Sequence, residues 1–195
     1  MEITKEKLDK IIEYSKKQIA KNDAWHRIFH VRQTVKWAKV LAKKEKADLN
    51  KSIVIAWLHD IAKNKHNSKI NHADEGAKMA KPFLKKLNFF DGDIKEICYA
   101  IQQHNKGGKK KTKEASIIWD ADKIQTMGAY GILRTYGYQI VLGKNQEEAY
   151  NKNIEQQKFF VKRFKTKTGR KIARKHYKFL AKFDKQYKKI HNAQP

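Results

Sequence analysis

The chain has 195 residues, enough for one domain with a substantial hydrophobic core. Its 45 lysine and arginine residues outnumber 20 acidic ones and give a net charge of +25, which we attribute mainly to a lysine-rich composition, with a contribution from an anionic substrate. The single cysteine excludes a disulfide framework and a cysteine-based zinc site. The lack of a long apolar run or a signal peptide predicts a cytoplasmic protein with no membrane contact.

The first half of the chain has the apolar periodicity of helices separated by polar loops. We expect helices over residues 3–22 and 24–46, a third that begins after a cap at Asp48 or Asn50 and includes the apolar run 53–58, and helices over 74–87 and 94–104. Loops are expected over 63–71 and 105–113. The third helix is nearly all apolar and is therefore expected at the centre of the fold. Pro82 is expected to end or kink the fourth helix, and Asp91-Gly92-Asp93 to form a turn that caps the fifth.

The second half of the chain continues the helical pattern. We expect a helix over residues 114–134, an ambiguous stretch with a crossing loop over 136–146, and two closing helices over 147–164 and 168–190. No repeat or linker divides the sequence. We therefore expect an all-α single domain over residues 1–195, in which about five core helices (about 20–140) form a bundle and the closing helices (about 147–190) complete it.

Histidine and aspartate residues stand at three separated places in the sequence. His59-Asp60 follows the apolar run of residues 53–58, His30 lies upstream, and Asp120-Ala121-Asp122 lies within another apolar stretch. Unpaired charges in such surroundings are costly, and a shared divalent cation would satisfy them. Imidazole and carboxylate ligands without a thiolate suit a metal that acts as a Lewis acid.

These residues belong to stretches that resemble the HD-domain superfamily of metal-dependent phosphohydrolases. The family pattern is a histidine, then His-Asp, then an aspartate, each on a different helix. The matching stretches are residues 26–30, 56–62, 72–77, 101–104, 120–134 and 168–173, so the likeness covers roughly residues 20 to 185. The motifs are weak singly and specific in combination.

The resemblance implies a ligand set for a divalent metal, which would be Mn²⁺, Fe²⁺, Co²⁺, Ni²⁺ or Mg²⁺. The ligands are His30, His59, Asp60 and Asp122. Asp122 is preferred to Asp120 because it directly precedes Lys123-Ile124, where family members have a basic residue and an aliphatic one. We expect His26 and Asp120 to support the ligands by hydrogen bonds and not to bind the metal.

Further residues follow from the same resemblance. His72 and His104 fall where some members place histidines that hold a second metal or a phosphate. Asp60, His104 and Lys63 are expected to take part in catalysis. Charged side chains that would bind the phosphates of a substrate are Lys63, Lys65, Lys106, Lys123 and Arg134, of which Arg134 is equally suited to a structural ion pair.

The sequence departs from the family pattern at two positions. Many members have an acidic residue about three positions after His-Asp, where this chain has Lys63, and the arginine often found after the first ligand is Gln33. The missing acid leaves the catalytic base unassigned, although a metal-activated water needs no separate base. The resemblance implies hydrolysis of a phosphate ester or anhydride by such a water, and we expect a nucleotide as the substrate.

A second hypothesis comes from a different class of protein: a basic nucleic-acid-binding module on the same fold, with a structural or lost metal. It depends on cations near the C-terminus that would bind a nucleic-acid backbone: Lys162, Arg163, Lys165, Lys167, Arg170, Lys171, Arg174 and Lys175. Aromatic residues between these cations have helical spacing and are expected in the core. Salt-sensitive binding without turnover of any nucleotide would favour this alternative.

Overall fold

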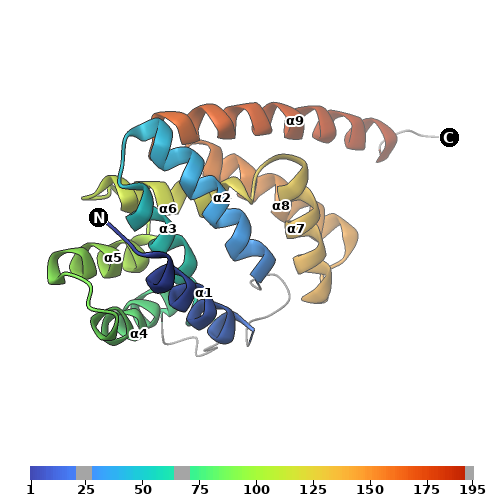
Figure 1. Cartoon of the computed structure of the whole chain (residues 1–195). Helices are drawn as coiled ribbons and strands as arrows, with labels where there is room; N and C mark the ends of the chain where they lie inside the picture. The colour runs from blue at the N-terminus through green and yellow to red at the C-terminus, as the bar shows by residue number, and fades with distance from the viewer. Residues whose placement is uncertain (21–27, 64–70, 192–195) are drawn as a thin grey trace. The chain divides into compact units, whose positions relative to one another are not determined.

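The computed structural model describes residues 1–20, 28–63 and 71–191, and this part of the chain is all helical, as predicted (Figure 1). The helices are α1 (Lys5–Ile19), α2 (Ile28–Glu45), α3 (Leu49–Leu58), α4 (His72–Lys86), α5 (Asp91–Gln103), α6 (Lys113–Ile124), α7 (Gly128–Val141), α8 (Gln146–Val161) and α9 (Lys167–His191). The chain divides into two compact units, Met1–Asp122 and Lys123–Pro195. The expectation of one domain therefore stays a prediction.

Helix α3 is the centre of the first unit, as its apolar sequence predicts. Every residue from Lys51 to Leu58 is buried, and α3 packs against α1, α2 and α5 (Figure 1). Burial of so many aliphatic side chains stabilises the fold by roughly 1.5–3 kcal/mol for each large one. The last residue of α3 is therefore held firmly at the place where His59 and Asp60 follow.

Polar contacts fix the start of α3. Asp48 caps its start, because the Asp48 side chain accepts a hydrogen bond of 2.9 Å from the Lys51 amide. The Lys51 ammonium group pairs with Asp93, at 2.9 Å, and with Glu96, both on α5. Burial opposes the charge on Lys51, but these two carboxylates prevail and raise its pKa. The pairs join α3 to α5, the helices that end at His59 and His104.

In the second unit, α7, α8 and α9 pack against one another. Tyr150, Ile154 and Leu180 form a buried cluster between these helices. The Tyr150 hydroxyl donates a hydrogen bond to Asp184 on α9, and Asn145 and Glu148 form a capping box at the start of α8. This small core holds the middle of α9 against α7 and α8.

The helix predicted over residues 114–134 is wrong: it is two helices, α6 and α7, separated at residues 125–127. Gly128 has φ +64°, a conformation that side chains with a Cβ rarely adopt. Gly131 lies so close to Thr126 that a Cβ there would be 2.2 Å from the Thr126 carbonyl oxygen. The two glycines therefore allow the chain to turn between helices. The stretch over residues 136–146, which was ambiguous in the sequence, is helical up to Val141, where α7 ends.

Two smaller predictions also need correction. Pro82 does not end α4, which continues to Lys86, so of its two expected effects only the kink stays a prediction. Helix α5 begins at Asp91, so Asp91 and Asp93 lie in its first turn and do not precede the helix. In the first turn their carboxylates interact favourably with the helix dipole. Among the described helices, none has both the length and the apolar character needed to cross a membrane.

Candidate metal centre

The four principal ligands expected from the sequence come together inside the first unit. His30 lies on α2, His59 is the C-cap of α3, Asp60 follows it, and Asp122 lies near the end of α6. All four side chains are buried. Residues that lie far apart in the sequence, on or next to three different helices, therefore converge at one place.

His30, His59 and Asp122 form one group whose donor atoms lie within 4.8 Å of one another. The Nε2 atom of His30 is 3.4 Å from Nε2 of His59 and 3.3 Å from Oδ1 of Asp122. Ligands about 2.1 Å from a single ion lie roughly 3.0–3.4 Å from each other when their angles are octahedral or tetrahedral. The spacing of this group therefore fits one ion.

Asp60 faces a second group with its other oxygen. Its Oδ2 lies 3.5 Å from Nε2 of both His30 and His59, whereas its Oδ1 lies 3.5 Å from Nε2 of His72 and 3.3 Å from Nε2 of His104. The Nε2 atoms of His72 and His104 are 3.2 Å apart. Asp60 therefore stands between two groups of donors, and the additional histidines of the sequence analysis complete the second one.

Backbone carbonyls fix the orientation of two of the imidazoles. Nδ1 of His59 donates to the Ala56 carbonyl oxygen at 2.8 Å, and Nδ1 of His104 donates to that of Ile101 at 2.7 Å. Each acceptor is one turn earlier on the helix that the histidine ends. Since a carbonyl can only accept, both Nδ1 atoms carry a proton and both Nε2 atoms point to the cluster.

Burial determines the charge of the cluster. It lowers the pKa of His59 to about 4 and that of His72 to about 3, although Asp60 opposes both shifts. Burial alone would raise the pKa of Asp60, but the surrounding imidazoles hold it well below its ordinary range. At neutral pH the cluster thus contains neutral His59 and His72 beside an ionised Asp60.

This donor set fits a divalent metal. The neutral His59 ring presents the lone pair of Nε2 to the same space as the Asp60 carboxylate, and two acceptors cannot satisfy one another. A cation in that space would satisfy both. The mixture of imidazole nitrogen and carboxylate oxygen suits Mn²⁺, Fe²⁺, Co²⁺ or Ni²⁺, and the carboxylates also suit Mg²⁺.

The cations expected to bind substrate are less uniformly placed. Lys63 is half-buried, and its charge contributes to the lowered pKa of His72, so it lies near the cluster. Lys106 pairs with Asp74 on α4 at 2.7 Å. His26 and Lys65 lie outside the described residues.

Three other expected residues do not yet have a tested role. Lys123 and Arg134 lie in the second unit, where the Lys123 ammonium group is 5.6 Å from the centre of the Phe160 ring. Their contribution to substrate binding stays a prediction. Asp120 is fully buried two residues before Asp122, so the two side chains leave α6 in different directions. Its supporting role is also still a prediction.

Two asparagines next to the second group were not expected from the sequence. The Asn71 side-chain oxygen caps α4 by accepting from the Ala73 amide at 2.9 Å, and also accepts from Asn105 Nδ2 at 2.8 Å. Asn71 directly precedes His72, and Asn105 directly follows His104. This hydrogen bond therefore ties together the two chain segments that carry these histidines. Adjacency to histidine was the only signal in the sequence.

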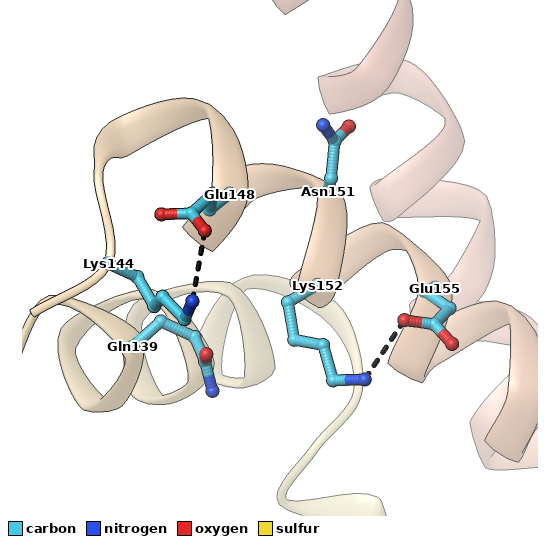
Figure 2. Close-up of a pocket in the computed structure, with 6 residues that line it drawn as sticks. All are labelled: Gln139, Lys144, Glu148, Asn151, Lys152 and Glu155. Atoms are coloured by element: carbon cyan, nitrogen blue, oxygen red, sulfur yellow. Dashed lines mark hydrogen bonds and ion pairs between the residues drawn. The ribbon is translucent and has the colours of Figure 1, made fainter. Parts of the chain in front are cut away.

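A hollow on the second unit has a different character. It lies between α7 and α8 and is lined by Gln139, Lys144, Glu148, Asn151, Lys152 and Glu155 (Figure 2). Lys144 pairs with Glu148 and Lys152 pairs with Glu155, each at 3.0 Å. Its lysine and glutamate charges are thus paired with one another at the surface. The buried histidine and aspartate cluster is the better candidate for chemistry.

Comparisons with known proteins find the same fold in solved structures. A crystal structure of a predicted HD superfamily hydrolase from an uncultured Thermotogales bacterium is 26% identical, with a TM-score of 0.71 over 92% of this chain and 90% of that one. Bacillus subtilis YpgQ, crystallised in complex with ADP, is 19% identical, with a TM-score of 0.78 over 94% of both chains. An HD-superfamily hydrolase from Bacillus thuringiensis is 23% identical, with a TM-score of 0.74 over 97% of this chain and 98% of that one.

A search of curated proteins found no match. The model of the HD domain matches residues 27–127, just over half of the chain, and this segment contains all six residues of the cluster. Membership of this family supports a hydrolase that depends on a divalent metal, in agreement with the donor set. From the family match and the structural likeness together, we conclude that the chain belongs to the HD-domain family.

Proposed function

We propose that the protein is a metal-dependent phosphohydrolase that cleaves a phosphate ester or anhydride bond of a nucleotide. The observation that carries this proposal is the position of Asp60, whose two oxygens face two separate groups of donors. Two ions held about 3.5–4 Å apart are a recurring device for displacement at phosphorus. A cytoplasmic location is part of the proposal, because the nucleotide substrates would be met there.

The residues that would hold the metals follow from the two groups. His30, His59 and Asp122 would hold one ion, His72 and His104 the other, and Asp60 would contact both. When bound, divalent ions would polarise the phosphoryl group and make a water molecule more acidic. This chemistry removes the need for an acidic side chain at position 63.

The protein's own side chains would orient the substrate and balance its charge. Lys63 lies close enough to affect the pKa of His72, so its ammonium group can attract a phosphate next to the second group. Lys106 is oriented by Asp74 and has an exposed fraction of 38%, so it is accessible to a more distant phosphate. His104 is fixed by the Ile101 carbonyl and keeps its Nε2 atom directed at Asp60.

A nucleotide is the substrate class that these observations favour. Several phosphates in a row would use more than one cation, which the pair Lys63 and Lys106 provides. YpgQ, which has the same fold at 19% identity, was crystallised in complex with ADP. That likeness supports the choice of nucleotides as the first compounds to test.

The test is phosphate release from a panel of nucleotides and phosphomonoesters after reconstitution with each divalent metal. We expect turnover of at least one nucleotide, and no turnover by Asp60→Asn. Lys63→Gln should keep its metal but lose roughly tenfold or more in kcat/KM, since a charge-assisted contact contributes about 1.5–3 kcal/mol. Lys36→Gln, an exposed change on α2, is the matched control. Fully metal-loaded protein that releases no phosphate from any compound would contradict the proposal.

A further inference from the structure

The positive charge of the chain is concentrated in one segment. Residues 158–189 contain 14 lysine or arginine residues and a single acidic one, Asp184, so a sixth of the chain carries about half of the net charge of +25. A general lysine-rich composition would spread the excess evenly. The concentration of lysine and arginine in this segment therefore requires an explanation other than a lysine-rich composition of the whole chain.

Half of these cations lie on one face of α9. All ten lysine and arginine residues of this helix are exposed. Seven of them recur every three or four residues and lie within an arc of about 80° when each residue turns the helix by about 100°. We call them the α9 basic stripe: Lys167, Lys171, Arg174, Lys178, Lys182, Lys185 and Lys189. At 1.5 Å per residue the stripe is about 33 Å long.

The opposite face of α9 is already occupied within the second unit. Ala173 and Leu180 are buried, and Tyr177, Phe183 and Tyr187 pack against the cluster that Tyr150 and Ile154 form with Leu180. Figure 1 shows α9 as one long helix without interruption. The stripe is therefore presented to solvent on a rigid rod. The apolar face is not free to enter a lipid bilayer, as an amphipathic membrane helix would require.

Carboxylates do little to neutralise these charges. In the described part of the second unit, the α9 cation that forms an ion pair is Lys188, whose ammonium group is 3.3 Å from the Asp184 carboxylate. Lys188 is not part of the stripe. Like charges three or four residues apart on a helix repel one another. The stripe therefore stores a repulsion that a polyanion would relieve and that folding alone does not require.

We propose that the α9 basic stripe binds the phosphate backbone of double-stranded nucleic acid without regard to sequence. Its length corresponds to about ten base pairs of duplex, which carry a dense row of phosphates. Six of its seven cations are lysines that act as point charges, with only Arg174 able to form a bidentate contact, as suits backbone binding. The stripe has no aromatic side chain of the kind on which single-stranded bases stack.

Because lysine predominates, binding should depend on charge and salt more than on base identity. The proposal does not rest on the hydrolase function, since the stripe lies in the second unit and the metal ligands lie in the first. Either can fail without the other.

The test measures binding of a labelled 20-base-pair duplex by fluorescence anisotropy at several salt concentrations. The stripe variant changes Lys171, Arg174, Lys178, Lys182 and Lys185 to glutamine. The control variant removes the same charge from exposed lysines of the first unit: Lys16, Lys36, Lys43, Lys81 and Lys85. We expect the stripe variant to bind at least about tenfold more weakly, with a salt slope shallower by about 4, and the control to bind almost as wild type does.

Three results would overturn the proposal. Equal weakening in both variants would show that net charge alone attracts the duplex. Preference for a labelled single strand over the duplex would reject the stated ligand. Binding to phosphatidylserine vesicles without salt-dependent duplex binding would identify an anionic membrane instead. Circular dichroism of both variants shows that each is folded, so a loss of binding cannot arise from loss of α9.

Discussion

At the scale of single residues, the feature that decides the chemistry is the pair of oxygens on Asp60. One oxygen faces His30 and His59, and the other faces His72 and His104. An asparagine in its place would offer one carbonyl oxygen, which accepts, and one amide NH2 group, which donates. It could therefore face only one of the two groups as an acceptor. The carboxylate is therefore required for its geometry as well as for its charge.

The hydrogen bond between Asn71 and Asn105 leads to a prediction about the second group. Asn105→Ala removes this bond but leaves Asn71 as the cap of α4. His72 and His104 should then be held less firmly, and affinity for the second ion should fall about 10–100-fold while the first ion is retained. Metal titration with elemental analysis measures both. Asn151→Ala, at an exposed position, is the control.

A result in which Asn105→Ala binds both ions as tightly as wild type would show that these asparagines do not position the histidines. Loss of both ions together would point to a general defect in folding. The stepwise loss of one ion is the outcome that distinguishes a positioning role from either alternative.

Much of the cluster could be predicted from the sequence, because its residues resemble a family pattern. His30, His59, Asp60 and Asp122 are adjacent to apolar stretches that place them in the interior. The division into two groups could not be predicted, since it depends on which oxygen of Asp60 each imidazole faces. The sequence is also silent on the hydrogen bond from Asn105, which joins residues 34 positions apart.

At the scale of elements, the turn between α6 and α7 explains why a periodic sequence is not one helix. Apolar spacing continues through residues 125–127, so the pattern alone predicts continuity. Gly128 and Gly131 instead allow a close approach that the backbone could not make with side chains at those positions. Asn153 donates a hydrogen bond of 3.0 Å to the Gly131 carbonyl oxygen and stabilises the turn. The conformation of these two glycines and the contact from Asn153 together account for the turn after α6.

A prediction about stability follows from this turn. Gly131→Ala should lower the free energy of unfolding by at least about 2 kcal/mol, because its Cβ would meet the backbone of Thr126. Gly107→Ala is the matched control, since a Cβ at Gly107 meets nothing within 4 Å. Urea unfolding followed by circular dichroism measures both changes. If Gly131→Ala is as stable as Gly107→Ala, the turn does not depend on the close approach of Gly131.

At the scale of the whole molecule, the helical class and the central position of α3 are confirmed by the structure. Both follow from periodic apolar residues, which are a local property of the sequence. The division into Met1–Asp122 and Lys123–Pro195 could not be seen in the sequence, because it falls inside α6 and no linker marks it. The two candidate binding sites are also divided between the units. The metal ligands lie in the first unit, whereas the α9 basic stripe lies in the second.

The central claim is that this chain holds divalent metal at two groups of donors that share Asp60. The most direct measurement is the number of ions bound per chain, by elemental analysis after reconstitution and removal of excess metal. We predict two ions for wild type and one for His72→Ala, which keeps His30, His59 and Asp122 intact. Wild-type protein that binds no ion, or only one, under these conditions would contradict the account.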